Sequence, residues 1–264
     1  MNRHPRRPEA FDALLFLPLV IIVLMVTGML VALASRLAPD ALWTALVSAE
    51  TRFALRLSLL TALAALGVGL GLALPAAYLM ARRDFPGKVL VDTLLDLPLV
   101  LPPLVVGISL LFLFGRHRLG APLAQFGIEI LFSPVGVVVA QSFLTTPLLL
   151  RTAKAAFVAV DSRFAEVAGT LRATPWDVFW SVELPLAAPG IAAGAVLAWA
   201  RALGEFGATL MLAGATRFHT ETLPMAIFLN IATGETEIAV ACALILLAIA
   251  FVLLLVLRLL PLPR

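Results

Sequence analysis

The chain contains few of the residues on which catalytic and metal-binding proteins depend. Only 13% of its 264 residues are charged, and it has one cysteine, three histidines and one tyrosine. Soluble domains carry about 25% charged residues. Cys242 stands alone, which excludes a disulfide within the chain, and the histidines are too scattered for metal-ligand spacing. We therefore expect neither a metal site nor a cofactor on this chain.

Nucleotide and nucleic-acid motifs are also missing. No phosphate-binding G-x-x-x-x-G-K-[ST] motif occurs, since Gly87-Lys88 is followed by Val89. The net charge of +3 comes from short basic clusters between apolar runs, not from a stripe interleaved with aromatic residues. An enzyme within the membrane is disfavoured too, because no nucleophile–base pair or histidine–cysteine cluster is present.

Long apolar runs are what the chain has in abundance, since 62% of its residues are hydrophobic. A membrane-spanning helix needs about 20 such residues, and in hydrocarbon a helix satisfies its own backbone. Six runs qualify: 13–34, 57–81, 97–114, 133–150, 184–216 and 238–257. The sequence therefore predicts an all-α polytopic membrane protein with a single transmembrane domain over 1–264.

The first run has an alternative interpretation. Arg3, Arg6 and Arg7 precede it, and the end of the run at 32–34 resembles a signal-peptide cleavage site. However, its apolar core of 22 residues exceeds the about 7 to 15 residues of a signal peptide. We expect a retained helix, and a mature N-terminus at Ser35 would contradict this.

The distribution of lysine and arginine sets the expected orientation. With the N-terminus inside, the inner segments hold 12 basic residues and the outer segments 6, while Arg201 lies within a span. Both termini, and the segment 160–185, are therefore expected to be cytoplasmic.

The segment 160–185 contains two short helix patterns. Asp161 or Ser162 can cap the first, which ends near residue 171 with its apolar residues at 3–4 spacing on one face. Thr174 can cap the second, with Asp177 in a capping-box position. Two amphipathic helices with apolar side chains predict a protein-docking surface. An ordinary loop lying on the membrane surface is the alternative.

The same segment carries a family resemblance. Glu166-x-Ala168 and then Val182-x-Leu184-Pro185 resemble the E-A-A-x3-G-x9-I-x-L-P loop of bacterial ABC importer permeases, which forms coupling helices on the nucleotide-binding subunit. Val167 replaces the second alanine, and Arg172 replaces the glycine that usually supplies a left-handed turn. The implied ATPase-docking residues are Phe164, Glu166, Val167, Ala168, Gly169, Leu171, Arg172, Pro175, Trp176, Leu184 and Pro185.

Two other stretches resemble the oxyanion permeases, which import molybdate, tungstate or sulfate. The third-helix signature of these permeases is similar to LLDLPLVLPP at 94–103, and their fifth-helix signature is similar to AWARALGEFGATLM at 198–211. The second stretch resembles molybdate permeases more than sulfate permeases. The resemblance implies a type I ABC importer permease in the bacterial inner membrane, working as a homodimer. Its implied partners are an oxyanion-binding protein, periplasmic or extracellular, and a cytoplasmic ABC ATPase dimer that binds ATP and Mg²⁺.

The same stretches contain the candidates for the transport pathway or gate. Prolines interrupt the helical hydrogen bonds, and glycines let two helices approach closely. Met211 suits an apolar constriction, and Arg201 can pair with Glu205 four residues on. That pair either gates the pathway or only locks helix packing. The candidates are Pro98, Pro102, Pro103, Arg201, Gly204, Glu205, Gly207 and Met211.

Two alternative functions remain open at this point. Sulfate or thiosulfate import is the main one. A secondary transporter that works without ATP would show paired repeats and ionisable residues on several spans, and the sequence shows neither.

Overall fold

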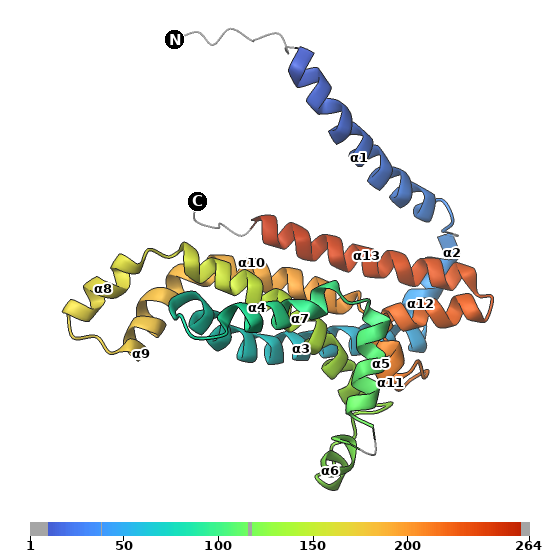
Figure 1. The fold of residues 1–264 in the computed structure, drawn as a ribbon. Helices are drawn as coiled ribbons and strands as arrows, with labels where there is room; N and C mark the ends of the chain where they lie inside the picture. Colours follow the sequence, from blue (N-terminus) through green and yellow to red (C-terminus); the bar gives the residue numbers. More distant parts are fainter. Residues whose placement is uncertain (1–9, 38, 116–117, 260–264) are drawn as a thin grey trace.

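The computed structural model describes residues 10–37, 39–115 and 118–259, which form helices and connecting loops with no strand among them. Figure 1 shows their arrangement. The helices are α1 (Ala10–Ala34), α2 (Pro39–Val47), α3 (Ala49–Arg82), α4 (Lys88–Val100), α5 (Pro103–Leu113), α6 (Gly120–Gln125), α7 (Pro134–Ala159), α8 (Ser162–Thr170), α9 (Pro175–Val178), the π-helical η1 (Phe179–Glu183), α10 (Leu184–Leu203), α11 (Gly207–Ala213), α12 (Leu223–Ala232) and α13 (Thr236–Leu259).

The centre of the fold is formed by α3, α7 and α10, which pack along one another (Figure 1). Small residues allow this close contact, as in other membrane bundles. A side chain at Gly69 of α3 would lie 2.7 Å from Leu149 of α7, and one at Gly194 of α10 would overlap Thr152 of α7. Alanines and Phe157 fill the space between these helices.

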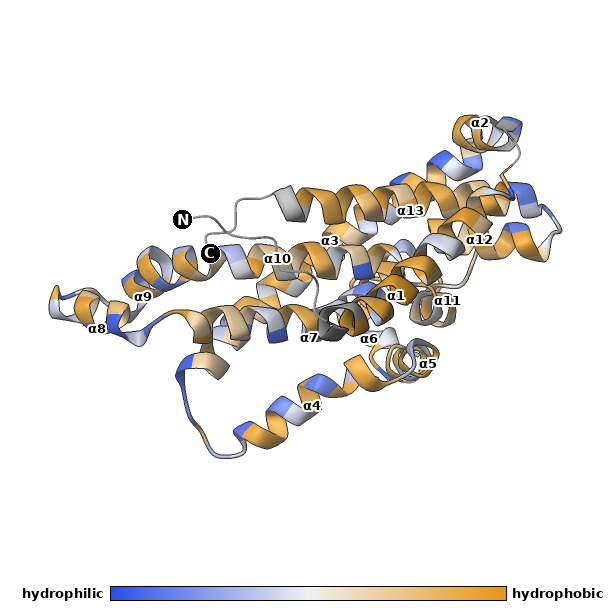
Figure 2. Ribbon diagram, turned by 90° about the horizontal axis from the view of Figure 1, so that it is seen from above, coloured by the Kyte–Doolittle hydropathy of each residue, from blue (hydrophilic) through white to orange (hydrophobic). Residues whose placement is uncertain are grey.

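The outer surface of the bundle is apolar. Large hydrophobic side chains are exposed along α1, α3, α5 and α13, and Figure 2 shows hydrophobic residues running over these helices. In water such a surface would be unfavourable, whereas lipid solvates it. Among the residues that the structure describes, five helices are long and apolar enough to cross a membrane, and α4 with α5 makes up to one more.

The predicted span over 97–114 is a strongly bent pair of helices, with its break at the prolines expected to interrupt it. The axes of α4 and α5 differ by 112°, and the break lies at Leu101 and Pro102. Pro102 and Pro103 have no N–H to continue the ladder, and a residue before proline is driven to extended backbone. Leu101 accordingly has φ −68° and ψ 139°.

The expectation of one helix over 184–216 is wrong. Helix α10 ends at Leu203, Gly204 caps it, and α11 starts only at Gly207. Gly204 and Gly207 both favour interruption because glycine is a poor helix former. At its other end α10 continues from α9 through η1, so that helical structure runs from Pro175 to Leu203.

Candidate functional site

The segment 160–185, which we call the docking loop, has the two predicted helix caps. The side chain of Asp161 accepts a hydrogen bond from the N–H of Arg163 (2.9 Å) at the start of α8. At α9 the N–H of Asp177 donates to the Thr174 hydroxyl (3.2 Å), and the N–H of Thr174 donates back to the Asp177 carboxylate (2.9 Å). The Thr174 hydroxyl and N–H together lower the pKa of Asp177. The capping box therefore stays charged and intact near neutral pH.

The turn between these helices has a left-handed residue even though glycine is missing. Arg172 has φ 64°. Its N–H donates to the carbonyl of Gly169 (3.1 Å), and the N–H of Ala173 donates to that of Ala168 (3.2 Å). This pair of bonds defines the Schellman motif, in which glycine is the usual residue at the Arg172 position. The turn expected of the family is thus formed by an arginine.

The docking loop lies at one end of the molecule (Figure 1) and exposes a set of apolar side chains. Phe164, Val167 and Leu171 of the first helix region are 54%, 60% and 78% exposed, and Trp176 is 69% exposed. Other predicted docking residues also have exposed or half-exposed positions: Glu166, Ala168, Gly169, Arg172, Pro175, Leu184 and Pro185. No described helix covers this surface, so it is available to another protein.

A buried ion pair attaches the docking loop to the bundle. Nε of Arg82, at the end of α3, lies 2.6 Å from Glu183 of η1, whose side chain is 1% exposed. Arg82 also donates to the carbonyl of Val160 (3.0 Å), which follows α7. We call this the Arg82–Glu183 clamp. The sequence analysis did not identify it, although each residue stands at the end of an apolar run.

Aromatic rings extend from the clamp into the loop. The ring centroids of Tyr78 and Phe179 are 4.7 Å apart, and Phe179 contacts both Trp176 and Trp180 at 6.2 and 5.2 Å. Between α3 and these rings lies an apolar cavity of about 680 Å³. The rings and the clamp together hold η1 against α3.

The candidate pathway residues lie mainly where α5 crosses α11. A side chain at Gly107 of α5 would lie 2.7 Å from both Ala208 and Met211, and one at Gly207 would lie 3.2 Å from Pro103 and Leu104. Two glycines thus bring the third- and fifth-span signatures into backbone contact. Pro98 lies elsewhere, in a separate apolar groove between α3, α4 and α7.

Arg201 and Glu205 form the predicted pair, but across the break instead of along one helix. Nη1 of Arg201 lies 2.6 Å from Oε2 of Glu205, and Oε1 of Glu205 accepts a hydrogen bond from the N–H of Ala208 (2.9 Å). Gln141 of α7 donates to the carbonyl of Ala202 at the same place (3.0 Å). Glu205 is 2% exposed and joins the end of α10 to the start of α11. Gly204 ends α10 without close contact to other elements.

Three features of this fold are typical of a membrane-embedded transport subunit. Its long helices expose apolar side chains, two spans are broken near the crossing of α5 and α11, and the capped helices α8 and α9 project from one end. Residues 69–261 match the family described as binding-protein-dependent transport system inner membrane component, and the chain belongs to that family. It is therefore a component of the inner membrane.

Individual relatives agree with this assignment. The chain is 40% identical over 241 residues to the molybdenum transport system permease protein ModB of Mycobacterium tuberculosis, covering 90% of this chain and 89% of the relative. It is 34% identical over 190 residues to the sulfate transport system permease protein CysT of Escherichia coli, covering 72% and 69%. A chain of the bacterial alginate ABC transporter, solved with an alginate-bound periplasmic protein, has the same fold, with a TM-score of 0.78, 17% identity and coverage of 96% and 93%.

Proposed function

We propose that this chain is the permease subunit of an ATP-driven importer for a tetrahedral oxyanion, molybdate or tungstate. Two copies form the pathway between them, and a binding protein delivers the oxyanion from outside. A separate ATPase dimer binds ATP and Mg²⁺ and drives alternating access. This chain itself has no ATP-binding motif.

The observation that carries the ATPase partnership is the docking loop with its clamp. The loop combines an exposed apolar surface with a buried attachment to the ends of α3 and α7. A surface of this kind can receive a partner and pass its motion to the membrane helices. The excess of lysine and arginine in the predicted inner segments supports a cytoplasmic position for the loop and for both termini.

The crossing of α5 and α11 is the part of the pathway that the contacts support best. We infer that four residues close the pathway at this crossing: Pro102, Pro103, Gly207 and Met211. The backbones of α5 and α11 are in direct contact there, which leaves no space for an ion to pass between them. Arg201 and Glu205 are assigned a structural role there. Both oxygens of Glu205 accept bonds that bridge α10 to α11, and the negative charge of this carboxylate would repel a passing anion.

The choice of molybdate over sulfate rests on identity over most of the chain, 40% to a molybdenum permease against 34% over a shorter stretch to a sulfate permease. The test is to reconstitute the permease with its ATPase and binding protein and to measure ATP hydrolysis. We expect stimulation by binding protein loaded with molybdate or tungstate. Stimulation by sulfate alone would overturn the substrate. Uptake that continues without the ATPase would overturn the ATP-driven mechanism.

A surface variant tests the docking loop in the same assay. Leu171→Asp places a charge on an exposed apolar position (78%), so ATPase co-purification and stimulation should both be lost. Phe126→Asp is the matched control and should retain both. Phe126 is also an exposed apolar residue (81%), but it lies at the end of α6, outside the docking loop. Equal loss in the two variants would contradict the assignment of the loop.

A further inference from the structure

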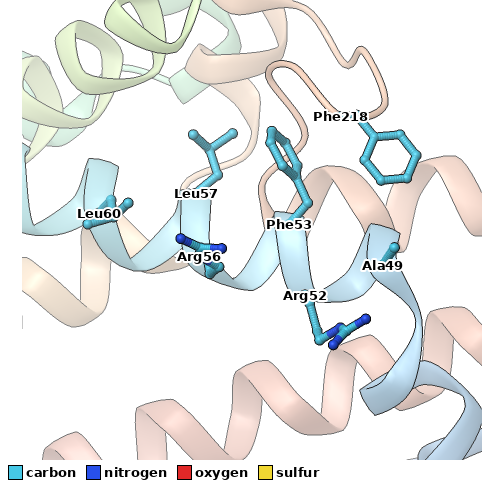
Figure 3. Close-up of a pocket in the computed structure, with 7 residues that line it drawn as sticks. All are labelled: Ala49, Arg52, Phe53, Arg56, Leu57, Leu60 and Phe218. Carbon is cyan, nitrogen blue, oxygen red and sulfur yellow. The ribbon is translucent and has the colours of Figure 1, made fainter.

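A cavity near the start of α3 has no part in the proposed transport cycle. It measures about 570 Å³ and is lined by Ala49, Arg52, Phe53, Arg56, Leu57 and Leu60 of α3 and by Phe218 of the loop between α11 and α12. Figure 3 shows these side chains around the opening. Two arginines one turn apart on the same helix are unusual, because like charges at this spacing destabilise a helix.

The two arginines lack an acidic partner. Among the described residues neither forms an ion pair, and both are exposed. The nearest acidic residue in sequence, Glu50, is taken by Arg217, whose Nε and Nη1 lie 3.1 and 3.3 Å from its carboxylate. The only hydrogen bond described for the Arg52 side chain is a long one from Nε to the carbonyl of Ser48 (3.4 Å). The cavity therefore holds two guanidinium groups whose N–H donors are largely without partners among the described residues.

The apolar side of the cavity continues onto the outer surface of the bundle. Leu60 and Leu63 follow the arginines at helical spacing on the same face of α3 and are 63% and 55% exposed. A cationic end above an apolar stripe matches the two ends of a phospholipid. A free oxyanion has no apolar part that could contact the leucine side chains.

The aromatic wall of the cavity is fixed in place. Phe218 has a left-handed backbone (φ 57°), and its N–H donates to the buried carboxylate of Glu221 (3.3 Å). Its ring lies against Phe53 with centroids 5.8 Å apart. Aromatic rings are enriched at the level of lipid headgroups, and a strained residue held by its surroundings often marks a functional position.

We propose that this cavity binds the phosphate group of an anionic phospholipid, with Arg52 and Arg56 on the phosphate and an acyl chain along Leu60 and Leu63. Arginine suits this task because its planar guanidinium bonds two phosphate oxygens at once. Phosphatidylglycerol offers such a phosphate without a compensating cation. A lipid seated here would fix the depth of α3 in the bilayer.

The test uses the full-length chain, purified in neutral detergent, and native mass spectrometry of bound phosphatidylglycerol. Arg52→Gln/Arg56→Gln should weaken binding about tenfold or more, since each arginine near anionic lipid contributes about 1 kcal/mol. Leu60→Asn should weaken it to a smaller extent. Arg36→Gln, which also removes an exposed arginine, is the matched control and should bind as the wild type does. Because both cavity arginines are exposed and repel each other, the thermal midpoint of the lipid-free variant should not fall.

Several results would overturn the proposal. Equal binding by the double variant would show that the arginines are not used. Equal binding of diacylglycerol, which has no phosphate, would show that only the apolar stripe matters. Displacement of the lipid by dissolved molybdate or inorganic phosphate at equal concentration would make the cavity a site for soluble anions. A change of oligomeric state in the lipid-free double variant would make it a contact between two copies of the chain.

Discussion

Arg172 shows how one residue can hold a backbone shape that normally needs glycine. Its left-handed conformation costs an L-residue about 1 to 2 kcal/mol, and two hydrogen bonds of the Schellman motif maintain it. Arg172→Gly removes this strain and adds flexibility to the unfolded chain, which offsets about half of the gain. The turn should therefore become more stable by about 0.5 to 1 kcal/mol.

Amide hydrogen exchange at Ala173 measures this local effect. Its N–H closes the motif, so exchange should slow severalfold in Arg172→Gly. Arg172→Ala is the control, because it removes the charge and keeps the left-handed residue with a side chain. Slower exchange in the alanine variant to the same extent would show that charge, and not backbone strain, limits the turn.

At the scale of the elements, the Arg82–Glu183 clamp joins the ends of α3 and α7 to η1. Glu183→Gln leaves Arg82, whose side chain is only 19% exposed, without its partner. Removing one member of a buried pair typically costs about 3 kcal/mol or more, so the thermal midpoint should fall clearly. ATPase stimulation should fall further than ATPase binding, because the loop is loosened and its outer surface is unchanged.

The pair between Asp84 and Lys88 is the natural control for the clamp. Asp84 lies in the loop that follows α3 and is 99% exposed, and Lys88 is the first residue of α4. Asp84→Asn should leave the midpoint and the stimulation unchanged, since exposed pairs contribute little. A Glu183→Gln protein that melts and couples like the wild type would contradict the clamp.

These elements also mark what the sequence could and could not predict. Apolar length located the spans, and capping residues located α8 and α9, because both signals are local. The break after Leu203 depends on Glu205 bonding to Ala208 and on Gln141 reaching Ala202 from α7. The clamp likewise joins residues far apart in the sequence. Such contacts follow from tertiary structure, so the pattern of apolar residues alone extended a helix through the break and did not find the clamp.

At the scale of the whole molecule, α1 differs from the other long helices. None of the residues in its most apolar stretch is buried, whereas 33% and 56% of the corresponding residues of α3 and α7 are. It leaves the bundle at an angle (Figure 1). The core is built from α3, α5, α7, α10, α11, α12 and α13. Its folding should therefore not depend on α1.

Cleavage of the folded protein tests this without disturbing membrane insertion. A protease site inserted after Arg36, between α1 and α2, should allow the α1 fragment to separate in detergent, while the rest keeps its midpoint within about 2 °C, less than 1 kcal/mol for a chain of this size. A site inserted at Gly234, between α12 and α13, is the control. The α13 fragment should stay bound, because Ala239, Ala241 and Cys242 are buried against the bundle. Co-elution of α1 with the core, or a large fall in the midpoint after its release, would show that α1 packs against the protein in solution.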